Sequence, residues 1–328
     1  MTPESSVRQF SDCNLTKNNL GRAETEIFMF PLVRKCYYYG EAMLIRKKYP
    51  AILIPLAVLW LTALGFATVY DLDISAAVSD EMSVYGRFFE IAGEPPAILF
   101  TSFNFFLLAT YRMRCTAFGL KDKLTAFLFA VLGTGMTVFT CVKTADYIIK
   151  WQNDMGVSVR DNSVVFFLAA VTALSICAVF IVTVIKISRD KLKRLYTVFK
   201  SCVLAAVFTF AVIWALKLVW GRVRFRSMDG DYSLFTPWYV INGFTGGFSF
   251  PSGHTANATV VFTSSHYLRF LSPEIKWVKP FIYGALFVWI ATVAFSRVCV
   301  GAHFLSDVLF GAAITILIIF FTRPKGEL

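Results

Sequence analysis

The chain has 328 residues, of which 57% are hydrophobic and only 16% are charged, and its mean hydropathy is +0.62. A soluble domain carries about a quarter charged residues, so this composition excludes an ordinary soluble protein. The net charge of +11 does not indicate a nucleic-acid partner, because the Lys and Arg residues lie mostly in short clusters between apolar segments. The seven cysteines form no CxxC pair, and we expect them to be buried small side chains.

In chain order, residues 1–50 are predicted to form a cytoplasmic tail with an interfacial segment, without a cleavable signal peptide. Residues 51–328 are predicted to form one transmembrane domain. Its apolar segments are close to the ~20 residues that cross a bilayer. They predict eight spans, at about 51–70, 96–111, 124–141, 164–187, 201–220, 255–271, 280–295 and 302–321.

The charges between these spans predict the topology. The basic segments 34–48, 112–123, 186–200, 269–279 and 323–328 all fall on one side of the eight spans. By the positive-inside rule this side is cytoplasmic and holds both termini. The acidic loop 71–94 and the polar-aromatic loop 221–254 then face outward. The predicted fold class is all-α, a polytopic transmembrane helical bundle.

A chemical motif lies just before and within the last span. His303 and Asp307 are four residues apart, so they share one face if the segment is helical. A carboxylate there can hold one imidazole nitrogen as N–H and leave the other free to attack an electrophile. Arg297 adds a fixed positive charge suited to an anion. These residues predict phosphoryl transfer.

Two other segments are predicted to reach the same place. Lys217 and Arg224 are seven residues apart, about two helical turns, so both can point from the end of the fifth span toward one spot. The segment 251–254, Pro-Ser-Gly-His, precedes the sixth span, where proline suits a first helical turn and the exposed N–H groups can cradle an anion. The sixth and seventh spans form a hairpin, so Arg297 and His303 emerge on the face that carries this segment.

The three segments together resemble the signature of a known superfamily. Lys217-x6-Arg224, Pro-Ser-Gly-His at 251–254 and Ser-Arg-x5-His-x3-Asp at 296–307 are similar to the motifs of the type 2 phosphatidic acid phosphatase (lipid phosphate phosphatase and vanadium haloperoxidase) superfamily. The resemblance covers about residues 200–322 and implies that 51–328 is a phosphatase domain with a six-helix core. The chain departs from the family pattern at Phe225, where proline is usual, and in its two additional spans.

The resemblance also implies roles. His303 would attack phosphorus, Asp307 would orient it, and His254 would protonate the leaving group and then assist water. The phosphate oxygens would be held by Lys217, Arg224, Arg297, the Ser252 hydroxyl and the backbone at Gly253. With three cationic side chains present, no metal or other cofactor is expected.

The expected activity is that of a membrane lipid phosphatase that acts through a phosphohistidine at the extracytoplasmic face. Phosphatidic acid, phosphatidylglycerophosphate, polyprenyl diphosphates and lipid A-type phosphates all remain candidate substrates. The expected partners are this lipid phosphate and the membrane lipids, and no nucleic acid is expected. The sequence does not predict the oligomeric state. Alternatives are a phosphotransferase with the same intermediate, a phosphatase of soluble phosphoesters, an inactive lipid-binding protein and, less favoured, a transporter.

Three polar residues near the motifs are open to a structural interpretation. His266, inside the sixth predicted span, is expected to pack or to form a hydrogen bond rather than react. Arg222 and Arg226 flank Arg224 and are expected either to widen a positive funnel or to bind lipid headgroups.

Overall fold

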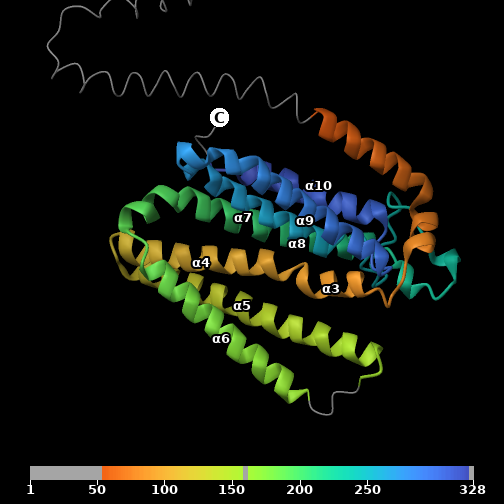
Figure 1. Ribbon diagram of the computed structural model, residues 1–328, viewed down its shortest axis with the longest axis horizontal. Coiled ribbons are helices and arrows are strands. Elements are labelled where there is room, and N and C mark those ends of the chain that lie inside the picture. The colour runs from red at the N-terminus through yellow and green to blue at the C-terminus, as the bar shows by residue number, and fades with distance from the viewer. Residues whose placement is uncertain (1–53, 158–161, 325–328) are drawn as a thin grey trace, which may run out of the picture. The chain divides into compact units, whose positions relative to one another are not determined.

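The computed structural model describes residues 54–157 and 162–324, and the predicted tail and interfacial segment at 1–50 lie outside these ranges. The described residues are helices joined by turns and loops (Figure 1). The first described helix runs Ile54–Val78. It is followed by α3 (Val84–Ala92), α4 (Pro95–Cys115), α5 (Leu120–Asp154), α6 (Ser163–Ile185), α7 (Arg189–Trp220), α8 (Gly253–Val260), the 3-10 helices η5 (Val261–Phe270) and η6 (Pro273–Val278), α9 (Lys279–Cys299) and α10 (Leu305–Thr322).

Within the described ranges, seven helices are long and apolar enough to cross a membrane, with α3 and α4 counted as one. The helical bundle predicted from the sequence is thereby confirmed. The predicted span 255–271 corresponds to α8 and η5, and this pair is not among the seven helices. The reason is its composition, because the segment carries His254, Asn257, His266 and several Thr and Ser residues.

The segments that join the helices gather at two ends of the bundle. At one end, Arg87 at the start of α3 pairs with Asp154 at the end of α5 (2.7 Å). The Asp80 N–H donates to the Cys299 carbonyl at the same end (2.7 Å). At the other end, the Arg114 guanidinium donates to the carbonyl of Ile185 (2.9 Å) at the last turn of α6. The helices therefore alternate in direction, as the predicted topology requires.

An apolar cluster in α4, α6 and α7 supports the end opposite the motif segments. In Figure 1, α4 lies between α7 on one side and α6 on the other. Phe106 of α4 and Phe199 of α7 are both nearly inaccessible to solvent. The cluster's buried members are Phe105, Phe106, Leu107, Leu108, Cys177, Val184, Leu192, Phe199 and Val203. Between spanning helices such side chains stabilise by close van der Waals packing rather than by leaving water, so this cluster fixes how the long helices pack.

Two segments expected to be loops are mostly helical. The acidic segment 71–94 was predicted to face outward as a loop, but the first described helix continues through Asp71 and α3 begins at Val84. The basic segment 186–200 was also predicted to be a loop, but α7 begins at Arg189, where the Ser188 side chain caps it. Both errors have one cause: charged residues between apolar segments were interpreted as solvent-exposed loops.

Candidate active site

His303 lies in the turn between α9 and α10 and is 3% exposed. Its Nδ1 is 2.6 Å from the carbonyl oxygen of Ser249, and a carbonyl oxygen can only accept a hydrogen bond. Nδ1 therefore carries the proton, and the lone pair of the neutral ring is on Nε2. This is the tautomer that a nucleophilic histidine needs.

Asp307 does not share a helical face with His303, because α10 begins only at Leu305. Its Oδ2 is 3.8 Å from His303 Nδ1, longer than a hydrogen bond. Oδ2 instead accepts from the Phe304 N–H (2.9 Å) and the Ser249 hydroxyl (2.6 Å). Asp307 thus positions His303 chiefly through Ser249, whose carbonyl holds the ring, and through the first turn of α10.

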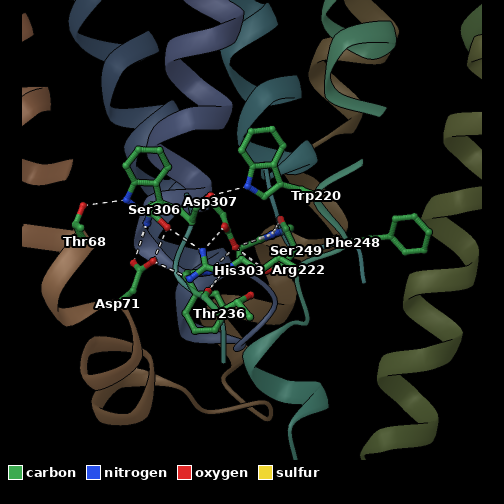
Figure 2. Close-up of polar contacts among 12 residues, drawn as sticks. Thr68, Asp71, Trp220, Arg222, Thr236, Phe248, Ser249, His303, Ser306 and Asp307 are labelled. Carbon is green, nitrogen blue, oxygen red and sulfur yellow. Dashed lines mark hydrogen bonds and ion pairs between the residues drawn. The ribbon is translucent and has the colours of Figure 1, made fainter. Parts of the chain in front are cut away.

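The side chain of Arg222 is fully buried and lies at the centre of this part of the site (Figure 2). Its Nη1 donates to Asp307 Oδ1 (2.6 Å), and its Nη2 donates to Asp71 Oδ2 (3.0 Å). The guanidinium carbon lies 4.0 Å from the centre of the Phe304 ring. Asp71 also accepts from the backbone N–H of Ser306 (3.0 Å). Neither role expected for Arg222 fits, because the side chain is occupied by two buried carboxylates.

The expected anion cradle at the start of α8 is smaller than predicted. Pro251 follows a cis peptide bond and precedes the helix instead of lying in its first turn. The Ser252 N–H donates to the Asp307 carbonyl (2.9 Å), and the Ser252 hydroxyl caps α8 by accepting from the Thr255 N–H (3.4 Å). Neither contact uses the N–H groups of Gly253 and His254, which remain the candidate anion donors.

Lys217 and Gly253 lie against each other at the site. Lys217 is in the last turn of α7 and is 7% exposed, and its Nζ donates to the Phe248 carbonyl (2.6 Å). A Cβ on Gly253 would lie 3.6 Å from Lys217 Cε. Helix α7 ends at Trp220, and its cap residue Gly221 is in the left-handed region (φ +55°). Arg224 is therefore in an extended segment instead of two helical turns after Lys217.

Two guanidinium groups at the site have unused donors. Among the described residues, the buried Nε atoms of Arg224 and Arg297 have no hydrogen-bond partner. Arg297 is in the last turn of α9, where its Nη1 lies 3.6 Å from Glu90 Oε1. Its backbone carbonyl accepts from the N–H of His303 (3.2 Å), which places the cation next to the histidine. Guanidinium donors of this kind suit the oxygens of a phosphate.

His254, in the first turn of α8, is surrounded by acceptors from α3 and the start of α4. Its Nε2 is 3.2 Å from the Glu90 carbonyl oxygen, and its Nδ1 is 3.6 Å from Glu94 Oε1. Glu94 is 5% exposed and also pairs with Lys143 of α5. Glu90 is equally buried and contacts the guanidinium groups of Arg87 (3.0 Å) and Arg226 (3.3 Å).

Burial disfavours the charged form of both histidines. It lowers the pKa of His303 to about 3; the nearby carboxylate of Asp307 opposes this effect, and the positive charge of Lys217 adds to it. Burial likewise lowers the pKa of His254 to about 4, with the carboxylate of Glu94 acting in the opposite direction. The lowered pKa of His303 leaves the lone pair on Nε2 available for attack.

The structure thus brings all the predicted site residues to one end of the bundle. Sequence reasoning missed Glu90, Glu94 and Ser249, which contact motif residues. It also missed Asp71, which pairs with Arg222, and Lys143, which pairs with Glu94. The acidic segment 71–94 was noticed, but no spacing rule connected it with motifs more than a hundred residues later. Within 54–157 and 162–324, no three His, Cys, Asp or Glu side chains form a group that could hold a metal.

The fold and site define a multi-pass helical membrane protein with two buried histidines and several cations at one end of the bundle. Residues 201–325 match the PAP2 superfamily. The chain is also similar to a phosphatidylglycerophosphatase B of Bacillus subtilis (strain 168), with 36% identity over 81 residues. That similarity covers 24% of this chain and 40% of the relative, so less than half of the relative's length is matched. No solved structure matches the chain.

Proposed function

We propose that this protein is a membrane lipid phosphatase that hydrolyses a phosphomonoester or diphosphate of an amphiphile through a phosphohistidine. One observation carries the proposal: the His303 ring is held by Ser249 with its lone pair on Nε2, beside two guanidinium groups with unused donors. The superfamily of residues 201–325 and the name of the Bacillus subtilis relative support the same chemistry.

The proposed reaction has two steps. In the first, His303 Nε2 forms a bond to phosphorus, the bond from phosphorus to the leaving oxygen breaks, and His254 gives that oxygen a proton. In the second, water attacks phosphorus, the N–P bond breaks, and His254 takes the water's proton. Arg224, Arg297 and Lys217 stabilise the charge on the nonbridging oxygens during both steps.

The substrate is proposed to be an amphiphile because the site lies where the spans end. A lipid with its tail in the bilayer presents its phosphate at this level of the membrane. Phosphatidic acid, phosphatidylglycerophosphate, polyprenyl diphosphates and lipid A-type phosphates all have this form. The name of the Bacillus subtilis relative makes phosphatidylglycerophosphate the first of these to test.

Phosphate release tests this proposal. Purified protein in detergent and EDTA is expected to release phosphate from at least one lipid class, and His303→Ala is expected to release none. His266→Ala is the matched control: His266 Nδ1 lies 3.3 Å from the Ser201 hydroxyl, away from the motif residues, so activity should be retained. Substantial activity in His303→Ala would refute the nucleophile. No release by the unaltered protein from any lipid would contradict the hydrolase.

Vanadate and the covalent intermediate give two further readouts. Vanadate mimics five-coordinate phosphorus and is expected to inhibit, because the same cations would bind its oxygens. A labelled phosphate on His303, trapped by an alkaline quench, would distinguish this mechanism from direct attack by water. Labelling that needs an added acceptor for turnover would identify a phosphotransferase.

We also propose that the site faces the extracytoplasmic side. The end opposite the site carries Arg112, Arg114 and the basic start of α7. An epitope inserted at the exposed Gly230, in the site-end loop, should be stained on intact cells. The matched insertion at the exposed Gly119, at the other end, should be stained only after permeabilisation, and the reverse pattern would contradict the orientation.

A further inference from the structure

The environment of His254 contains a carboxylate that the motif pattern does not include. Glu94 precedes α4 and lies outside the segment that matches the superfamily. Its Oε1 lies 3.6 Å from His254 Nδ1 and accepts from the Asn257 amide (2.9 Å), one helical turn further along α8. Its Oε2 pairs with Lys143. Glu94 is therefore held by two partners in the orientation that faces the imidazole.

Both nitrogens of the His254 ring face oxygens: Nε2 is within hydrogen-bond distance of the Glu90 carbonyl, and Nδ1 is at ion-pair distance (3.6 Å) from Glu94 Oε1. A neutral imidazole has one N–H, so it can serve only one of the two, whereas the protonated ring can serve both. The Glu90 carbonyl, 3.2 Å from Nε2, is the weaker acceptor because it carries no net charge. The proton on Nε2 is thus the more easily transferred one, while the proton on Nδ1 would be retained by the carboxylate.

We propose that Glu94 is the positioning residue of His254, which holds Nδ1–H so that Nε2–H is directed to the leaving oxygen. The proposal rests on the function proposed above. In the first step, the electron pair of the breaking P–O bond stays on the leaving oxygen, which takes the Nε2 proton, and Glu94 stabilises the imidazolium beforehand. Lys143 keeps Glu94 in place but does not touch the reacting atoms.

The charges around His254 explain why a carboxylate is needed there. Arg297 of α9 and Lys143 of α5 face the ring and disfavour its protonated form, as burial does. Glu94 and Glu90 favour the protonated form, and the ring of Tyr147 lies 6.0 Å from the imidazole. Replacing Glu94 with glutamine would leave the two cations opposed only by Glu90. The protonated ring would then become scarcer at neutral pH.

Substrates with two kinds of leaving group distinguish this role from a merely structural one, because only one of them needs a proton from His254. Short-chain phosphatidic acid leaves a basic alkoxide that needs a proton, whereas p-nitrophenyl phosphate leaves a phenolate that does not. We expect Glu94→Gln to lower kcat on phosphatidic acid roughly 10- to 100-fold with little change in KM, a part of what a whole general acid supplies. The p-nitrophenol burst of Glu94→Gln should stay within about 2-fold of that of the unaltered protein. As the pH is raised, the rate of phosphatidic acid hydrolysis should begin to fall at a lower pH in Glu94→Gln.

Asp122→Asn is the matched control, since it also turns a carboxylate between α4 and α5 into an amide. Asp122 pairs with Arg112 (3.3 Å) at the opposite end of α5, about 30 Å along the helix from Lys143. Asp122→Asn should change neither kcat on phosphatidic acid nor the p-nitrophenol burst. Equal losses on both substrates in Glu94→Gln, or no loss on either, would overturn the positioning role.

A second measurement does not depend on turnover. The chain has three histidines, so ring resonances of histidine-labelled protein can be assigned with His254→Gln and His266→Ala. The pKa of His254 should fall in Glu94→Gln and stay unchanged in Asp122→Asn. An unchanged pKa in Glu94→Gln would refute the proposal even if no tested lipid were hydrolysed. If the unaltered protein hydrolysed none of the substrates while the pKa of His254 shifted as expected, the proposed function would be contradicted and the contact between Glu94 and His254 would stand.

Discussion

Replacing Arg222 with methionine tests whether a buried guanidinium holds the site together. Arg222 is fully buried between Asp307 (2.6 Å) and Asp71 (3.0 Å), which are also inaccessible to solvent. Methionine fills a similar volume but leaves both carboxylates without their cation. Removing one partner of a buried ion pair costs about 3–5 kcal/mol, because the remaining charge is uncompensated. Two carboxylates share this cation, so we expect the free energy of unfolding to fall by at least about 3–5 kcal/mol.

The assay is the loss of helical circular dichroism during SDS titration in mixed micelles. Arg112→Met is the control, because Arg112 pairs with Asp122 at 3.3 Å while its side chain is 34% exposed. A pair near the surface that is partly open to solvent in this way contributes about 0–1 kcal/mol. Equal, small losses in the two variants would refute the reasoning. Adding Asp71→Asn to Arg222→Met should recover part of the loss; no recovery would assign the effect to packing against Phe304 instead.

Two further predictions concern packing and pH. A Cβ on Gly311 would lie 2.6 Å from the Ser252 carbonyl oxygen, so Gly311→Ala should destabilise the protein by about 1–3 kcal/mol and lower phosphate release. Gly284→Ala in α9, where nothing lies within 4 Å, should do neither in the same assays, and similar losses in both would contradict the close approach. Unfolded histidines bind protons below about pH 6.5, whereas the pKa values of His254 and His303 in the fold are about 4 and about 3. The unfolded state therefore binds more protons in this window, and the free energy of unfolding should fall as the pH drops from 6.5 to 4. The fall should be shallower in the His254→Gln/His303→Gln variant, and equal slopes would contradict the burial of the two rings.

Much of the fold was predictable because the apolar segments are long and separated by charge. The third span, predicted at about 124–141, is longer in the structure, where α5 runs Leu120–Asp154. The hydrogen-bonded role expected for His266 is confirmed by its contact with Ser201. Span counting failed at α8 and η5, because this segment is packed among other helices at the site and its composition is polar. The polar residues of this segment serve contacts within the protein, so its mean hydropathy is lower than that of a spanning helix.

The motif residues were found because their types and spacing are unusual, but their contacts were not predictable. The interval between His303 and Asp307 suggested one helical face, whereas the chain turns at 300–304 and Asp307 instead serves the start of α10. The carboxylates of Asp71, Glu90 and Glu94 looked like solvent-exposed acids. Each of these carboxylates is buried because it forms an ion pair with a cation from a distant part of the chain. Periodicity within one segment carries no information about such partners.

The ion pair between Asp71 and Arg222 has a consequence for how such sequences can be recombined. The segment that carries the three motifs contains Arg222 but not Asp71, Glu90 or Glu94, which belong to earlier helices. A chimera that grafts this segment onto the front half of a relative would inherit buried cations without their counter-ions. The segment that carries the motifs is therefore not an interchangeable module. A successful exchange would also have to transfer Asp71, Glu90 and Glu94 from the earlier helices.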